Sequence, residues 1–128
     1  MKAFMKNVLI IEEDPSYRRL LKSVLQQLGA QYEEATDATE ALRQISKAPP
    51  HLIIMDINLP DNSGLGLLKK IRSTEETSKV PIVIFSSTTS IELIMLLKRI
   101  GISDFIVHNL EISKIQEKLE KVLVSVEA

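Results

Sequence analysis

The sequence predicts an α/β protein in which one parallel sheet is covered by helices on both faces. Short runs of consecutive apolar residues, such as residues 8–11 and 52–55, fit strands that are buried on both sides. These runs alternate with longer segments in which apolar residues recur every three or four positions, as they do along one side of a helix. Because strand and helix patterns alternate along the whole chain, we expect one compact five-fold β/α unit.

The first strand and helix carry clear boundary signals. Residues 8–11 (VLII) predict a short buried strand. Asp14 is a suitable N-cap for the helix that follows, Pro15 suits its first position, and Gly29 suits its end. We therefore expect a helix between Pro15 and Gly29.

The second strand and helix are marked by charge and by proline. Residues 31–35 (QYEEA) predict a strand near an edge of the sheet, because they include two glutamates. Asp37 and Glu40 stand three residues apart, as in a capping box, and predict the start of a helix that ends before Pro49. Residues 52–55 (LIIM) are the third strand.

The second half of the chain continues the alternation. Thr89 and Glu92 resemble the cap of a helix that ends near Gly101. The other expected elements are helices at residues 64–72 and 112–126 and strands at residues 81–85 and 104–107. No internal repeat or low-complexity linker interrupts the pattern.

Composition limits the functions that the protein can have. The 128 residues are 45% hydrophobic and 26% charged, which is typical of one soluble domain with its own core. The net charge of −1 gives no reason to expect a nucleic acid or a membrane surface as partner. There is no cysteine, which excludes disulfides and thiolate metal sites, and no apolar run has the length of a membrane span. We expect a cytoplasmic protein.

Acidic residues follow two of the expected strands. Glu12, Glu13 and Asp14 come directly after the first strand, and Asp56 directly follows the third. In a parallel sheet, binding sites lie beyond the carboxyl ends of the strands, so these carboxylates are expected to converge. Converging carboxylates repel each other unless a cation is present, and oxygen ligands without thiolates favour Mg²⁺ over zinc. An aspartate beside Mg²⁺ can act as a nucleophile towards phosphorus.

At this point the chain resembles a known family, the receiver domains of bacterial two-component response regulators. The resemblance covers residues 7–126 and rests on the acidic pair, on MDINLPDNSGLGLLKKIR around Asp56, on PIVIFSS and on GISDFIV, in that order. It implies a flavodoxin-like (βα)5 three-layer sandwich with a parallel five-stranded sheet of order 2-1-3-4-5. It also implies that residues 1–128 form a single receiver domain without an effector domain.

The resemblance implies a role for each residue near the acids. Asp56 matches the phosphoacceptor, to which a histidine kinase or a phosphotransfer protein gives a phosphoryl group. Glu12, Glu13 and Asp56, with the backbone carbonyl of Asn58, match the ligands of Mg²⁺. Such a domain is not an enzyme beyond phosphorylating and dephosphorylating itself.

Ser86, Phe105 and His108 match the positions that contact the phosphate and switch conformation, and two departures stand out. Glu13 replaces an aspartate and is one methylene longer, which weakens the near-octahedral geometry that Mg²⁺ needs. His108-Asn109 replaces a lysine-proline pair, so a fixed positive charge becomes a histidine that is mostly neutral at pH 7. Without the proline, the cis bond usual at this place costs roughly 3 kcal/mol.

The helix after Thr89 is apolar on two sides. One side suits the core and is formed by Leu93, Leu96, Leu97 and Ile100. The opposite, outer side predicts a partner surface formed by Ile91, Ile94, Met95 and Lys98. The resemblance implies a downstream protein or a second copy of the chain, as a homodimer, at this surface.

Two other kinds of function remain open. A degenerate receiver that acts as a phosphorylation-independent binding module would keep the fold without phosphate chemistry. A hydrolase that uses Ser86, His108 and Asp56 is the enzyme alternative, although Ser86 lacks the sharp turn of a nucleophile elbow.

Overall fold

A computed structural model describes residues 4–127 of the chain and confirms the predicted α/β architecture. The strands are β1 (Phe4–Ile11), β2 (Ala30–Ala35), β3 (Leu52–Met55), β4 (Ile82–Ser86) and β5 (Asp104–Val107). The helices are α1 (Pro15–Leu28), α2 (Ala38–Lys47), α3 (Gly64–Ser73), α4 (Ile91–Ile100) and α5 (Ile112–Glu127), with short 3-10 turns η1 (Pro60–Asn62) and η2 (Glu75–Thr77).

The five strands form one parallel sheet in the order β2-β1-β3-β4-β5, as predicted. The charged strand β2 lies at an edge, where Glu34 pairs with Arg18 and Lys22 of α1. Strands β1 and β3 are neighbours in the sheet although β2 lies between them in sequence. The chain adds β2 on one side of β1 and all later strands on the other side, so the order of strands reverses at β1. Sites in open parallel sheets form at such a reversal.

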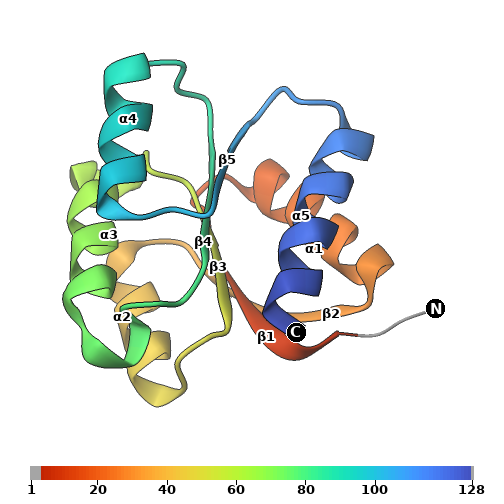
Figure 1. The fold of residues 1–128 in the computed structure, drawn as a ribbon, viewed down its shortest axis with the longest axis horizontal. Coiled ribbons are helices and arrows are strands. Elements are labelled where there is room, and N and C mark those ends of the chain that lie inside the picture. Colours follow the sequence, from red (N-terminus) through yellow and green to blue (C-terminus); the bar gives the residue numbers. More distant parts are fainter. Residues whose placement is uncertain (1–3, 128) are drawn as a thin grey trace.

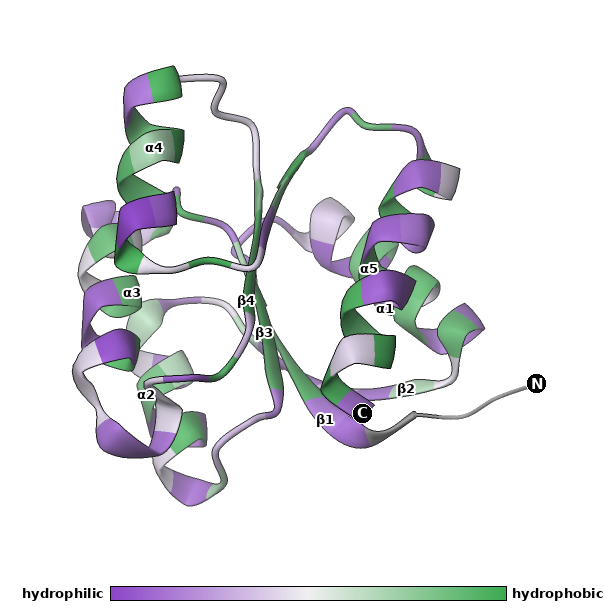
Figure 2. Ribbon diagram, in the orientation of Figure 1, coloured by the Kyte–Doolittle hydropathy of each residue, from purple (hydrophilic) through white to green (hydrophobic). Residues whose placement is uncertain are grey.

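Helices α1 and α5 cover one face of the sheet, and α2, α3 and α4 cover the other (Figure 1). The side chains of the strands point alternately to two separate cores. Val8 and Ile10 face the core that α1 and α5 cover, and Leu9 and Ile11 face the core that α2, α3 and α4 cover. The central strands are hydrophobic along their length in Figure 2. Because both faces of β1, β3 and β4 are buried, these strands contain consecutive apolar residues instead of an alternating pattern.

Helix ends follow the sequence signals at α1 and α2 and differ at α4. Asp14 accepts hydrogen bonds from two backbone amides of α1, and Asp37 accepts one from Glu40. At α4 the N-cap is Ser90, whose Oγ accepts from the backbone N–H of Leu93 at 3.2 Å, so the prediction of Thr89 was wrong by one residue. Several hydroxyl residues precede α4, and composition alone does not identify which one caps it.

None of the helices in the described part of the chain is both long and apolar enough to cross a membrane.

Candidate functional site

The site lies where β1, β3, β4 and β5 end side by side. Ile11 pairs with Met55 in the sheet, so the next residue of each strand, Glu12 and Asp56, leaves the same edge. The backbone N–H of Asp56 still donates to Ile11, which continues the sheet by one residue. These hydrogen bonds fix the two carboxylates beside each other.

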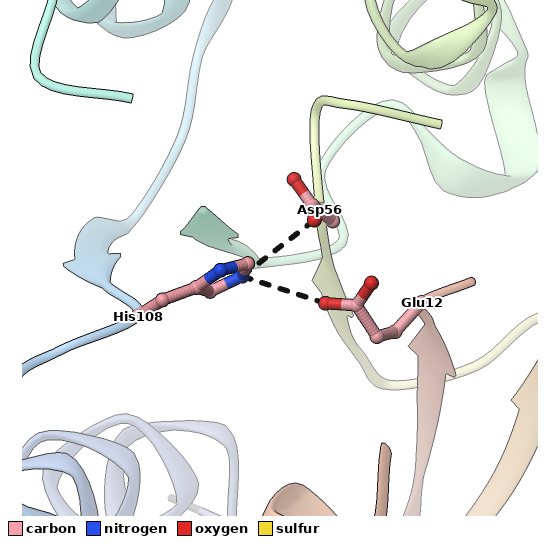
Figure 3. Close-up of side chains that lie close together, drawn as sticks. All are labelled: Glu12, Asp56 and His108. Atoms are coloured by element: carbon pink, nitrogen blue, oxygen red, sulfur yellow. Dashed lines mark ion pairs between the residues drawn. The ribbon is translucent and has the colours of Figure 1, made fainter. Parts of the chain in front are cut away.

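Figure 3 shows the third member of this group, His108, which follows β5 by one residue. Its Nε2 lies 3.5 Å from Oε1 of Glu12 and 3.5 Å from Oδ2 of Asp56. The backbone N–H of His108 donates to the carbonyl of Ser86 at 2.9 Å, which aligns the end of β5 with the end of β4. The imidazole therefore points inwards between the carboxylates and does not lie on the surface.

Two aromatic rings hold the imidazole in place, and neither was predicted to belong to the site. The ring of Tyr17 is stacked on His108 with centroids 3.8 Å apart, and the ring of Phe85 is 4.4 Å away. Nε2 also lies 3.1 Å from the carbonyl oxygen of Phe85. The one sequence signal for Tyr17 was its place in the first turn of the helix that follows the acidic residues.

The carboxylate of Glu12 is buried, which is unfavourable because only one of its two oxygens has a hydrogen bond. One of its oxygens, Oε2, accepts from the backbone N–H of Asp14 at 3.2 Å, and the other, Oε1, has no hydrogen bond. Burial raises the pKa of Glu12 from 4.5 to about 8; the Asp14 hydrogen bond opposes the rise and the charge of Asp56 adds to it. Such a carboxylate is stabilised by a nearby cation.

Glu13 and Asp14 do not join the group of Glu12, Asp56 and His108, although both line the same hollow. The side chain of Glu13 is exposed, and its backbone carbonyl accepts from Arg18 at 2.7 Å. Asp14 caps α1, as its position predicted. Of the acidic residues after β1, Glu12 is therefore the one whose carboxylate lies in a group with Asp56 and His108.

Asn58 connects Asp56 to Ser86. Its backbone N–H donates to Oδ1 of Asp56 at 2.9 Å, and its side-chain Nδ2 donates to Oγ of Ser86 at 3.1 Å. Ser86 is fully buried, and its neighbour Ser87 lines the hollow instead. Among the described residues, the Ser86–His108 hydrogen bond that a hydrolase triad requires is not formed.

Phe105 and the outer face of α4 lie apart from the hollow. Phe105 pairs with Ile84 in the sheet and packs, half-buried, against the core under α4. On α4, Ile91 and Met95 are 70% and 59% exposed, Ile94 is half-buried and Lys98 is exposed. The described residues contain no cis peptide bond, so the bond between His108 and Asn109 is trans.

The oxygen atoms around the hollow are suitable ligands for a cation. Two buried carboxylates meet there, Glu13 and Asn58 line the opening, and Oε1 of Glu12 lacks any hydrogen-bond donor. A divalent ion would neutralise the repulsion between Glu12 and Asp56.

Comparison with known proteins gives a consistent set of relatives. Residues 8–120 match the response regulator receiver domain family. The chemotaxis protein CheY-3 of Vibrio cholerae is 30% identical over 116 residues, which are 90% of this chain and 89% of that protein. CheY1 of Helicobacter pylori is 28% identical over 120 residues, covering 91% and 95% of the two chains.

Solved structures show the same fold. A putative response regulator from Chloroflexus aurantiacus matches with a TM-score of 0.85 and 26% identity, over 96% of this chain and 99% of that one. The chemotaxis response regulator CheY4 of Vibrio cholerae matches with a TM-score of 0.83 and 29% identity, over 92% and 98%.

Proposed function

The chain belongs to the response regulator receiver domain family, and from this premise we propose that it accepts a phosphoryl group on Asp56 and signals through α4. Receiver domains are signalling domains of two-component systems and are not classical enzymes. The donor would be a phosphohistidine on a kinase or a phosphotransfer protein.

The observation that carries the proposal is the way in which Asp56 is held. Its Oδ1 is occupied by the backbone N–H of Asn58, while Oδ2 is directed towards the hollow and His108. A fixed carboxylate with one oxygen available is suited to attack an electrophile that enters from the open side.

The transfer is a substitution at phosphorus. A carboxylate oxygen of Asp56 attacks the phosphorus of the phosphohistidine, and an O–P bond forms while the P–N bond breaks. The bonding electrons leave with the imidazole nitrogen of the donor, and the product is an acyl phosphate on Asp56. Such transfers depend on positioning and on neutralisation of the phosphoryl oxygens.

A divalent cation such as Mg²⁺, when bound, supplies that neutralisation. Glu12, Glu13, Asp56 and the backbone carbonyl of Asn58 are the groups that would hold it, since all of them border the hollow. The residues of the chain itself position the nucleophile and screen it from water.

Ser86 and His108 are the proposed contacts of the phosphoryl group. The Ser86 hydroxyl would exchange its partner Asn58 for a phosphoryl oxygen, and the imidazole of His108 would contact another. Phe105 packs under α4 and pairs with Ile84 of β4, so a change at Ser86, the last residue of β4, would be passed to it. A downstream protein would then recognise Ile91, Ile94, Met95 and Lys98.

The test is intact mass after mixing the protein with acetyl phosphate and Mg²⁺. We expect one added phosphoryl group, which Asp56→Asn and EDTA abolish. Asp61→Asn is the matched control, because Asp61 is an exposed aspartate in the loop after β3 and should leave the adduct unchanged.

A phosphorylation-independent binding module is the second candidate, and one observation favours it. The imidazole of His108 lies between Glu12 and Asp56, where it limits the space for a phosphoryl group. If a folded protein gave no adduct with any divalent ion, the chain would be assigned to this class.

A further inference from the structure

A nitrogen donor lies within the candidate cation site. Nε2 of His108 lies between the two carboxylates (Figure 3), 3.5 Å from one oxygen of Glu12 and 3.5 Å from one oxygen of Asp56. One ligand atom from each of the three residues lies within 4.8 Å of the other two. An ion that binds both carboxylates at this place therefore meets an imidazole as well.

Oε1 of Glu12 independently indicates that a ligand belongs here. Glu12 is 2% exposed, and this oxygen faces the group without a hydrogen bond. A buried carboxylate oxygen normally has a hydrogen-bond donor or a metal ion beside it.

The hydrogen bonding of His108 shows how an ion would fit. A carbonyl oxygen can only accept, so Nε2 carries a proton when it bonds to the Phe85 carbonyl at 3.1 Å. That proton faces the Phe85 carbonyl and has the Glu12 and Asp56 carboxylates close by. A cation in its place would face the same oxygens and the nitrogen lone pair, while the ring proton would reside on Nδ1.

The spacing and the ring packing favour a transition ion. A four-coordinate ion with bonds of about 2.1 Å holds its ligand atoms about 3.4 Å apart, close to the observed distances from Nε2. The rings of Tyr17 and Phe85 already orient the imidazole, so little reorganisation is needed. Imidazole is a good ligand for borderline ions such as Zn²⁺ and Co²⁺, whereas Mg²⁺ prefers oxygen atoms and water.

We propose that Glu12, Asp56 and His108 together bind a divalent transition-metal ion of the Zn²⁺ and Co²⁺ class, with His108 supplying selectivity over Mg²⁺. This inference rests on the proposed function in so far as it names the ion that accompanies the phosphoacceptor. It differs from the sequence prediction, in which oxygen ligands alone pointed to Mg²⁺.

The first experiment compares ion preference in two histidine variants of the full chain. Affinities for Zn²⁺ and Mg²⁺ are measured by competition with Co²⁺, whose visible absorption reports its ligands. In His108→Gln we expect the preference for Zn²⁺ over Mg²⁺ to fall by at least about tenfold. His51→Gln is the matched control, because His51 is the chain's other histidine and is exposed before β3; it should keep the wild-type ratio. An unchanged ratio in His108→Gln would overturn the inference.

The second experiment needs no change at the site and so cannot be confused with misfolding. Long-range ¹H–¹⁵N spectra of the wild-type imidazoles are recorded during titration with Zn²⁺, and the spectrum of His51→Gln assigns the two rings. We expect Nε2 of His108 to shift while His51 stays in place. A saturated protein in which the His108 nitrogens do not shift would exclude the imidazole as a ligand.

The outcomes separate this inference from the proposed function. If the protein binds Zn²⁺ through His108 but forms no acyl-phosphate adduct, the metal-site inference holds and the proposed phosphoacceptor role of Asp56 is wrong. If the adduct forms and His108→Gln leaves the ion preference unchanged, the phosphoacceptor role holds and the metal-site inference is wrong.

Discussion

Two regions of the molecule depart from the usual distribution of charged and apolar groups, and they do so in opposite ways. At the carboxyl edge of the sheet, the charged residues Glu12 and Asp56 are buried. On α4, the large apolar residues Ile91 and Met95 are exposed. Each arrangement suits a different partner: buried carboxylates suit a cation, and exposed apolar side chains suit another apolar surface.

The difference between the regions lies in how firmly each is held. The edge is fixed by strand pairing, by Asn58 and by the stacked rings around His108. Helix α4 has one fully buried residue, Leu97, whereas α5 has three, Ile115, Leu119 and Leu123. A rigid edge suits chemistry, and a weakly anchored helix suits a change in position.

Leu97→Ala should produce the largest effect, because it removes the one fully buried side chain of α4. We expect a loss of about 3 kcal/mol in the free energy of unfolding, measured by urea denaturation. Hydrogen exchange should become fastest in α4 while α5 stays protected. The control is Leu119→Ala, which should lower the protection of the whole domain; equal loss of protection everywhere in Leu97→Ala would show that α4 is not a separate unit.

Glu12→Gln should stabilise the protein in EDTA by about 2 kcal/mol at pH 8, roughly half of what the full pKa difference corresponds to, because solvent screens part of the buried charge. The pKa of Glu12 is about 8 in the folded protein and ordinarily 4.5, so the folded state binds more protons than the unfolded state between these values. Wild-type stability therefore falls as pH rises from 4.5 to 8, and the variant lacks this contribution. Urea denaturation in EDTA across this range measures the difference, which should vanish near pH 4.5.

The matched control for that prediction is Glu13→Gln, which removes an exposed carboxylate next to Glu12. Its pH profile should follow the wild type. A constant difference between Glu12→Gln and the wild type at all pH values would mean that packing, and not the buried charge, distinguishes them.

The fold and the location of the site could be predicted from the sequence because they depend on local patterns. Consecutive apolar residues marked β3 and β4, the caps Asp14 and Asp37 marked two helix starts, and the glutamates of β2 marked an edge. The convergence of Glu12 with Asp56 followed from the geometry of parallel strands. These features need no knowledge of tertiary contacts.

The parts that were missed depend on contacts between distant segments. The direction of the His108 ring is set by Tyr17 and Phe85, which lie far from it in sequence. Successive side chains of an extended chain point to opposite sides, so either Glu12 or Glu13 can face the site, but not both. A shift of β1 by one residue in the sheet would exchange them. Similarly, the choice between Thr89 and Ser90 as helix cap depends on backbone angles that the composition of the loop does not reveal.

Ser90→Ala tests that correction and also the attachment of α4. Loss of the hydrogen bond from the Leu93 N–H to Ser90 Oγ should reduce stability by about 1 kcal/mol, measured by thermal or urea unfolding. Thr89→Ala, one residue earlier, should change it by less than half of that. The reverse order would restore the cap predicted from the sequence.

Met95→Gln should have the smallest effect on stability. It therefore tests the exposed face of α4 separately from Leu97, the buried residue that holds the helix to the core. Met95 is 59% exposed, and its replacement should change the free energy of unfolding by less than about 0.5 kcal/mol. If this face binds a second copy of the chain, sedimentation equilibrium of the acetyl-phosphate-treated wild type should show dimers that Met95→Gln weakens. Lys114→Gln on the exposed part of α5 is the control and should leave association unchanged. A strong loss of stability in Met95→Gln would mean that the residue anchors α4, and the contrast between a buried anchor and an unpartnered outer face would no longer hold.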